Sequence, residues 1–252
     1  MNKYLRNLNK IEFVITYACS GRCKHCSEGE HNRSGLSFDK DIAVYSVKRI
    51  SEDYNIKTCM TFGGEPLLYS DTVCAIHNAA REVGIEHRQI ITNGYFSCNK
   101  DIITSTAKKI AECGANDVLL SVDAFHQETI PLDTVLLFAC EILRCNVPVR
   151  TQPAWLVNRE HDNKYNNITH SLLARFEEIG IPQNEGNVIF PSGNALKYLN
   201  HYFDAETIPQ NPYVEDPYNI KTVSFDPDGS VLGENCYNKD IIDILSDYDP
   251  KR

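Results

Sequence analysis

The chain has 252 residues, of which 42% are hydrophobic and 23% are charged, so it can form one large α/β domain with a sizeable core. Its formal net charge of -9 argues against a nucleic-acid duplex as the main partner, because phosphate binding usually requires a basic surface. Residues 1–16 contain no apolar run long enough for a signal peptide or a membrane span, so we expect a cytoplasmic protein without membrane contact.

Short apolar runs alternate with amphipathic stretches of helical length along most of the chain. In chain order, the pattern predicts strand 11–16, helix 37–54 with Ser37 as its N-cap, strand 58–62, helix 70–84, strand 88–92, helix 100–113, strand 117–123, helix 132–145, strand 147–156, helix 166–180 and strand 187–190. Six strand–helix units with apolar strands indicate a parallel sheet covered by helices. We therefore predict an α/β fold, a partial (β/α)6 barrel of the TIM type, over residues 1–220.

Residues 221–252 have a different character. The stretch 222–233 is typical of a β-hairpin that turns at Asp228 and Gly229, and a short helix begins near Asp240. We predict that this segment is a C-terminal extension that packs on the mouth of the barrel.

Polar stretches follow the predicted strands at the points where the strands end. They are the cysteine-containing loop 16–29, GGEP at 63–66, TNG at 92–94, SVDAFH at 121–126, QP at 152–153 and PSGN at 191–194. Because the carboxyl ends of parallel strands meet at one edge of the sheet, these stretches are expected to form one site.

Three cysteines, Cys19, Cys23 and Cys26, lie within eight positions among Gly, Ser, Lys and Arg. Thiolates at this spacing can bind zinc or an iron–sulfur cluster. His25 offers zinc a fourth ligand, but ligands at 23, 25 and 26 would crowd one ion. A four-iron cluster held by three cysteines keeps one iron open, which favours a catalytic centre over a structural one. Most of the other seven cysteines are expected to pack as small apolar residues.

Cys-x3-Cys-x2-Cys after a first strand, followed by Gly-Gly-Glu-Pro after a second, resembles the radical S-adenosylmethionine (radical SAM) superfamily, and the resemblance covers about residues 11–195. It implies that Cys19, Cys23 and Cys26 ligate a [4Fe–4S] cluster whose fourth iron binds SAM. It also implies that reductive cleavage of SAM yields a 5′-deoxyadenosyl radical, which abstracts a hydrogen atom from a substrate.

The resemblance extends to residues that would bind SAM. Gly63 and Gly64 let the backbone approach a ligand closely, and Glu65 offers an acceptor for the methionine ammonium group. His25 takes the position where the family usually has an aromatic residue near the adenine. Contacts to the SAM carboxylate and ribose are expected from Thr92, Asn93, Ser121, Asp123 and Gln152.

Candidate catalytic residues come from two other places. Asp123 and His126 lie in the loop after the fourth strand, where they can bind substrate or move protons, or can simply form a solvated loop. Cys236 lies in the C-terminal segment, which resembles a reduced form of the extension (SPASM or twitch type) that carries auxiliary clusters in peptide-modifying relatives. It can donate a hydrogen atom to a substrate radical, ligate an auxiliary cluster, or pack in the core.

The leading hypothesis is a radical SAM enzyme that acts on a ribosomal peptide or a peptide-like molecule. An activating enzyme for a glycyl-radical protein and an enzyme for a free small molecule are the alternatives, together with a zinc or iron–sulfur module without catalysis. A flavodoxin or ferredoxin is expected to deliver the electron, docking near Arg22 and Lys24 in the cysteine loop.

Overall fold

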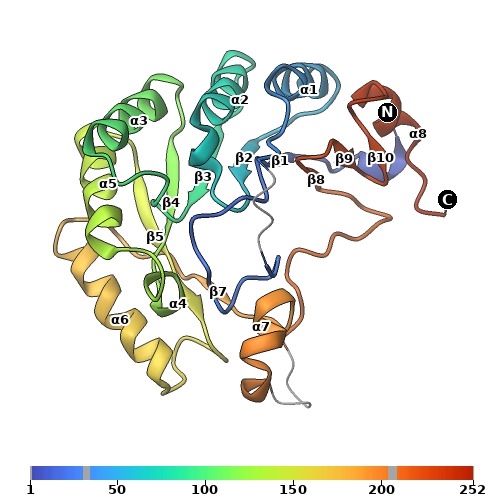
Figure 1. Cartoon of the computed structure of the whole chain (residues 1–252). Helices are drawn as coiled ribbons and strands as arrows, with labels where there is room; N and C mark the ends of the chain where they lie inside the picture. The colour runs from blue at the N-terminus through green and yellow to red at the C-terminus, as the bar shows by residue number, and fades with distance from the viewer. Residues whose placement is uncertain (1, 31–34, 204–208, 252) are drawn as a thin grey trace.

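A computed structural model describes residues 2–30, 35–203 and 209–251. Its centre is a six-stranded parallel sheet in the order β5-β4-β3-β2-β1-β8 (Figure 1). The strands are β1 (Lys10–Val14), β2 (Thr58–Phe62), β3 (His87–Thr92), β4 (Asp117–Ser121), β5 (Val149–Gln152) and β8 (Thr222–Phe225). The two edges, β5 and β8, do not pair with each other, so the sheet is an open barrel and the predicted fold class is confirmed.

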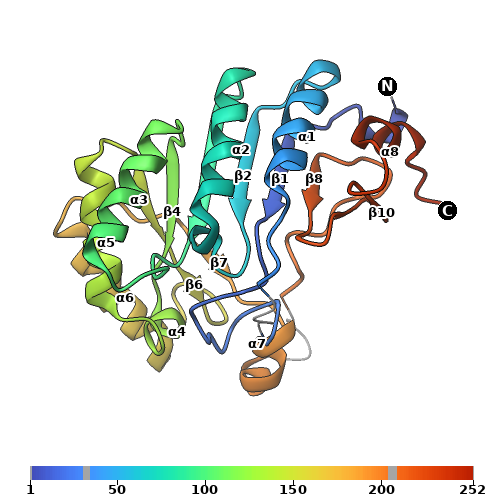
Figure 2. The same cartoon turned by 45° about the horizontal axis from the view of Figure 1, so that its top comes forward.

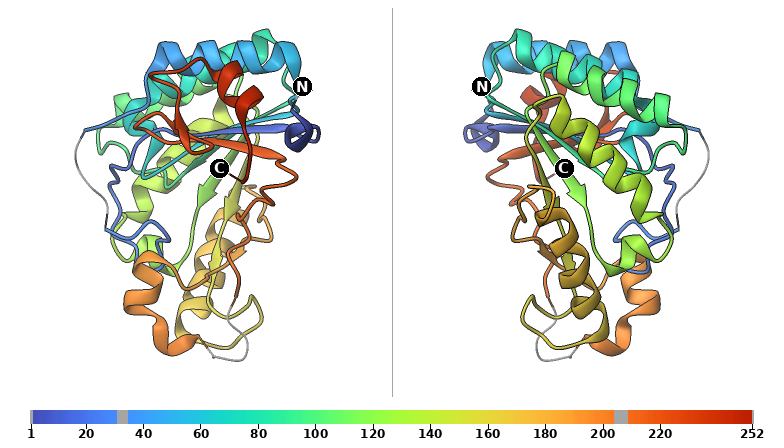
Figure 3. Two further views of the ribbon diagram at one scale, coloured as in Figure 1. Left: turned by 90° about the vertical axis from the view of Figure 1, so that its right-hand side faces the viewer. Right: turned by 90° about the vertical axis from the view of Figure 1, so that its left-hand side faces the viewer.

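Helices cover the outer face of this sheet (Figure 1). They are α1 (Lys40–Asp53), α2 (Ser70–Glu82), α3 (Lys100–Glu112), α5 (Leu132–Arg144) and α6 (Lys164–Glu177). Short helices lie elsewhere in the chain: η1 (Lys3–Leu5), η2 (Pro66–Tyr69), α4 (Ala124–Gln127), α7 (Gly193–Tyr198), η3 (Asn200–Tyr202) and α8 (Ile241–Asp247). In the two side views, α1 and α2 lie at one end of the molecule and α6 and α7 at the other (Figure 3).

Side-chain caps explain where several helices begin. The carboxylate of Asp39 accepts hydrogen bonds from the backbone N–H groups of Asp41 and Ile42, and Asn99 and Asn163 cap α3 and α6 in the same way. The prediction of Ser37 as the N-cap was wrong, because Ser37 forms a β-bridge with Thr16 instead.

The sixth strand of the sheet is not the predicted one. The predicted segment contributes β7 (Asn187–Val188), which pairs only with β6 (Ala154–Trp155) in a small separate sheet. The place beside β1 belongs to β8, because its Val223 and Phe225 are fully buried and the Phe225 ring stacks on that of Phe13 at 4.6 Å. Asn187 and Val188 are exposed and offer the core no such surface.

The predicted hairpin over 222–233 was also wrong in its pairing. Strand β8 runs parallel to β1, and the antiparallel pair is β9 (Ser230–Val231) with β10 (Glu234–Asn235). Its turn lies at Leu232 and Gly233, both of which have positive φ. Asp228 and Gly229 form the preceding turn, in which the Gly229 N–H donates to the Asp226 carbonyl at 2.8 Å.

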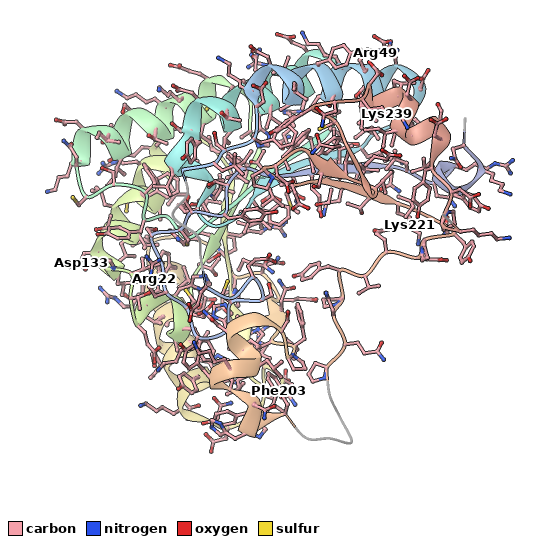
Figure 4. The ribbon with its side chains drawn as sticks, turned by 45° about the vertical axis from the view of Figure 1, so that its right-hand side comes forward. Arg22, Arg49, Asp133, Phe203, Lys221 and Lys239 are labelled. Carbon is pink, nitrogen blue, oxygen red and sulfur yellow. The ribbon has the colours of Figure 1, made fainter. Side chains whose placement is uncertain are left out.

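Helix α8, near the end of the segment after β8, packs beside α1 rather than over the carboxyl ends of the strands (Figure 2). Tyr45 of α1 donates a hydrogen bond to Asp240, and Ile244 and Leu245 of α8 are buried. Lys239 lies at the end of the molecule where Arg49 lies, away from Arg22 of the cysteine loop (Figure 4). The boundary at residue 220 stays a prediction. Within the described residues, no helix is both long and apolar enough to cross a membrane.

Candidate functional site

A cavity of about 530 Å³ lies at the carboxyl ends of the strands. It is lined by all but two of the predicted site residues, namely Cys19, Cys23, His25, Cys26, Gly63, Gly64, Thr92, Asn93, Ser121, Asp123, His126 and Gln152. They come from the ends of β1 to β5 and from the loops that follow. The two exceptions are Glu65 and Cys236.

The three cysteines lie on the loop after β1. Cys23 is buried and Cys19 and Cys26 are half-buried, and a Cβ on Gly21 would lie 3.3 Å from the Cys23 Sγ and 3.6 Å from the Cys19 Sγ. Burial raises the pKa of the Cys19 thiol to about 12 and also raises that of Cys26. Three sulfur donors on one cavity fit an iron–sulfur cluster, which binds thiolates and therefore displaces these protons.

The predicted PSGN stretch holds the cysteine loop from the other side. The Asn194 side-chain amide donates to the Cys23 carbonyl at 3.1 Å, and its backbone N–H donates to the Cys26 carbonyl at 2.9 Å. The hydroxyl of Ser192 donates to the Ser27 carbonyl at 3.0 Å. Gly193 is required here, because its φ is +48° and a Cβ would lie 2.3 Å from the Ser27 carbonyl oxygen.

Replacing Asn194 with alanine is expected to loosen this loop. The variant removes the amide donor to the buried Cys23 carbonyl but leaves the Cys26 backbone N–H, which donates to the same oxygen at 3.3 Å, so the loss of one hydrogen bond costs about 0.5–1.5 kcal/mol. We expect reconstituted protein to release iron to a chelator several-fold faster than the wild type. Asn167→Ala is the matched control, because that amide bonds an exposed Asp162. Equal release from wild type and Asn194→Ala would contradict the bracing role.

Gly63 and Gly64 let two backbone segments approach each other. The Gly64 N–H donates to the Thr16 carbonyl at 2.7 Å, and the Glu65 N–H donates to the Ala18 carbonyl at 2.8 Å. A Cβ on Gly64 would lie 2.1 Å from the Ala18 oxygen. Both glycines also line the cavity. The sequence predicted that they let a ligand approach the backbone, and in the structure they let the start of the cysteine loop approach it.

Glu65 does not line the cavity, although it was predicted to accept the methionine ammonium. It is fully buried, and its carboxylate accepts hydrogen bonds from the Thr92 hydroxyl (2.7 Å) and from the backbone N–H groups of Asn93 (2.8 Å) and Leu67 (2.9 Å). Glu65 therefore positions the end of β3. Burial raises its pKa to about 7 although all three donors lower it.

The raised pKa of Glu65 predicts a pH-dependent stability. The folded protein binds this proton more tightly than the unfolded chain, so the stabilisation is complete below about pH 4.5 and is lost as the pH rises through 7. In the wild type, the free energy of unfolding should fall by up to about 3 kcal/mol between these two pH values, and we expect Glu65→Gln to remove this fall. Denaturant unfolding of the metal-free protein at several pH values measures it, and parallel curves for both proteins would contradict the prediction.

Thr92 and Asn93 are both buried and both face the cavity. The side-chain amide of Asn93 donates to the Cys19 Sγ at 3.5 Å and to the Ser20 hydroxyl at 3.3 Å. Asn93 therefore contacts a predicted metal ligand as well as the cavity. Ser121 and Gln152 are paired neighbours on β4 and β5, and the Asn184 amide donates to the Gln152 side chain.

Asp123 and His126 form a dyad at the N-terminus of α4. The His126 Nδ1 lies 2.8 Å from the fully buried Asp123 carboxylate, which also accepts from the backbone N–H groups of Phe125, His126 and Ala154. Burial opposes ionisation of Asp123, but the imidazoles of His126 and His25 outweigh it and lower its pKa. Burial would likewise lower the pKa of His126, but the Asp123 carboxylate and the Cys23 thiol raise it.

His25 lies between the dyad and the cysteines. Its ring centroid is 5.0 Å from that of Phe125 and 4.8 Å from that of His126, and burial lowers its pKa to about 4. The ligand atoms of Cys23, His25 and His126 lie within 4.8 Å of one another. The Nδ1 atom of His25 is buried and finds no hydrogen-bond partner among the described residues.

Cys236 lies outside the cavity. It is buried in the main hydrophobic core and lines a separate, open hollow of about 460 Å³ against α1. The structure therefore does not bring this thiol to the other three, and core packing is the role that its surroundings support.

Arg22 and Lys24 are only partly available for a partner. The Arg22 guanidinium donates to the carbonyls of Cys19 (3.0 Å) and Gly21 (2.6 Å), and Lys24 pairs with Glu128 at 3.1 Å. The Lys24 and Glu128 side chains are 42% and 35% exposed, so this ion pair contributes little to stability and can exchange.

Several cavity residues were not among the predicted site residues: Glu12, Asn211, Tyr213, Ser224 and Asp226, together with Tyr17 and Glu28, which lie within the predicted stretch 16–29 but were given no role. Glu12 carried a signal, since it is a charge inside an otherwise apolar strand. Asn211 and Tyr213 lie in an irregular segment, and no periodicity could have placed them at the cavity.

The comparisons with known proteins agree with this geometry. The profile of the Radical SAM superfamily matches residues 13–142. The chain is 28% identical to the GTP 3',8-cyclase of Clostridium perfringens (strain 13 / Type A) over 159 residues, which is 59% of this chain and 47% of that protein. It is 31% identical to the probable GTP 3',8-cyclase of Sulfolobus acidocaldarius over 120 residues, 47% of this chain and 36% of that protein. The chain thus matches less than half the length of either relative.

Two solved structures are among those that share the fold. One is native anSMEcpe with bound AdoMet, at a TM-score of 0.58 and 15% identity over 89% of this chain and 73% of that one. The other is Streptococcus suis SuiB bound to S-adenosylmethionine, at a TM-score of 0.59 and 13% identity over 97% and 67%. Since the family profile covers half of the sequence and includes the cysteine loop, the chain belongs to the radical SAM superfamily, whose members are enzymes that use a [4Fe–4S] cluster and S-adenosylmethionine.

Proposed function

We propose that this chain cleaves S-adenosylmethionine reductively at a [4Fe–4S] cluster held by Cys19, Cys23 and Cys26, and that a hydrogen atom is then abstracted from a substrate. One observation carries the proposal: the three thiols share a cavity with all of the residues predicted to bind SAM except Glu65. When bound, the cluster supplies the electron that breaks a carbon–sulfur bond of SAM.

The chain's own residues position the reactants and exclude water. The Asn93 side chain donates to the cysteine loop and accepts the Tyr95 backbone N–H in the turn after β3, and the Asp123–His126 dyad also lines the cavity. Met60, Phe62 and Phe190 give the cavity an apolar lining, which keeps water from the reacting atoms.

A peptide or peptide-like molecule is the substrate that we favour. The fold resembles that of anSMEcpe with bound AdoMet and Cp18Cys peptide, at a TM-score of 0.55 and 15% identity. The relatives named GTP 3',8-cyclase support a small-molecule substrate instead. Flavodoxin or ferredoxin is the proposed electron donor, and the exposed Lys24 beside the cysteine loop is a contact that we propose for it.

The decisive experiment uses protein purified and reconstituted with iron and sulfide without oxygen. Dithionite and SAM are added, and 5′-deoxyadenosine is measured by mass spectrometry. We expect a brown protein that bleaches on reduction and forms 5′-deoxyadenosine. A colourless protein that binds zinc would contradict the proposal, as would a fully loaded protein that does not bind SAM.

A further inference from the structure

The wall of the cavity next to β1 and β8 carries three carboxylates. Glu12 lies on β1, Asp226 directly follows β8, and Glu28 follows the last cysteine of the loop. Glu12 is neutralised by Lys10, whose Nζ lies 2.7 Å away. Within residues 2–30, 35–203 and 209–251, neither Glu28 nor Asp226 forms an ion pair.

The negative charge at Asp226 is electrostatically unfavourable in the protein alone. Burial raises its pKa, and the charges of Asp228 and Glu28 raise it further, whereas a hydrogen bond from Tyr17 lowers it. Like charges at the edge of a partly enclosed cavity repel one another. A cation placed between them would relieve this repulsion.

Aromatic rings stand beside these carboxylates. Tyr17 bonds Asp226, and Tyr213 lies near Glu12 with its ring centroid 6.2 Å from that of Phe190. All three rings line the cavity. Carboxylates combined with aromatic rings are the groups that proteins use to bind ammonium and guanidinium ions.

From the carboxylates and rings that share this wall, we infer that the substrate is a peptide that presents a basic side chain, lysine or arginine, to Glu28 and Asp226. The inference rests on the proposed function, because it assigns the substrate class of that same cavity. A nucleoside triphosphate would bring its own negative charges to this wall and be repelled. The carboxylates therefore select a positively charged side chain of the substrate at the mouth of the cavity. The substrate carbon that loses its hydrogen atom lies closer to the three cysteines.

The test is equilibrium dialysis of the reconstituted holoenzyme with SAM. One pool of blocked heptapeptides has a central lysine and randomised flanks, a second has acetyl-lysine at the same position, and GTP is dialysed separately. We expect at least about tenfold greater retention of the lysine pool than of the acetyl-lysine pool, since only the former makes charge-assisted bonds. Equal retention of the two pools, including none of either, would overturn the inference, as would tighter retention of GTP.

Variants locate the effect. Asp226→Asn combined with Glu28→Gln is expected to remove the preference for lysine, whereas Glu30→Gln, in the same loop but paired with Lys197, should keep it. A preference that survives the double variant would overturn the assignment to these residues. Dithionite is then added to the same samples and 5′-deoxyadenosine is measured: its absence in a protein that still prefers lysine would count against the proposed function alone.

Discussion

Replacing Cys23 with alanine is expected to abolish 5′-deoxyadenosine formation. Cys23 is buried, lies beside the Cys19 Sγ across Gly21, and contributes one of the three thiols of the cavity. Loss of a hydrogen-bonding partner of a metal ligand typically lowers activity 10–100-fold, so loss of the ligand itself should exceed about 100-fold. Iron content, visible absorbance and 5′-deoxyadenosine are measured together after reconstitution.

Cys98→Ala is the matched control, because Cys98 is exposed and does not line the cavity. It should load iron and form 5′-deoxyadenosine as the wild type does. If Cys23→Ala kept a full complement of iron and full product formation, the three thiols would not be the cluster ligands.

Replacing Gly64 with alanine should damage the same site without touching a metal ligand. The new Cβ would overlap the Ala18 carbonyl oxygen, which belongs to backbone and has little room to move. The loop must shift and lose the two hydrogen bonds that join it to the segment after β2. Overpacking usually lowers the free energy of unfolding by about 1–3 kcal/mol, and we expect a clash between two backbone segments to lower it by about 3 kcal/mol or more.

Urea unfolding and iron retention measure this effect. Gly84→Ala serves as the control, since Gly84 has φ +82° and a Cβ at this position would have no atom within 4 Å, so only local backbone strain of about 1 kcal/mol is added. We expect iron loading to fail in Gly64→Ala and to persist in Gly84→Ala. Comparable iron retention in both would show that the loop tolerates displacement.

The fold was largely predictable because the pattern was local. The strands β1 to β5 are short apolar runs, and the helices between them carry apolar residues at helical spacing, so the first five repeats were placed correctly. Because the carboxyl ends of parallel strands meet at one edge of the sheet, the sequence also predicted that the cysteines lie near Thr92, Asn93, Ser121 and Gln152, and these residues line one cavity.

What failed depends on contacts between distant segments. Thr222–Phe225 looks like one arm of a hairpin because Asp228 and Gly229 are a strong turn signal, yet Phe225 gains more by stacking on Phe13. The path of the chain after this strand takes Cys236 to α1. Glu65 was predicted to bind the SAM ammonium because it belongs to the Gly-Gly-Glu-Pro motif. In the structure its carboxylate accepts hydrogen bonds from Leu67, Thr92 and Asn93 instead.

The bracing of the cysteine loop has a consequence for biosynthesis. The amide that holds the Cys23 carbonyl comes from a residue 171 positions later, and β1 acquires its second neighbour only with Thr222–Phe225. While the ribosome is still making the middle of the chain, the three thiols have emerged but their supports have not. Metal delivery should therefore act on the completed polypeptide, and the nascent loop is exposed to oxidation throughout translation.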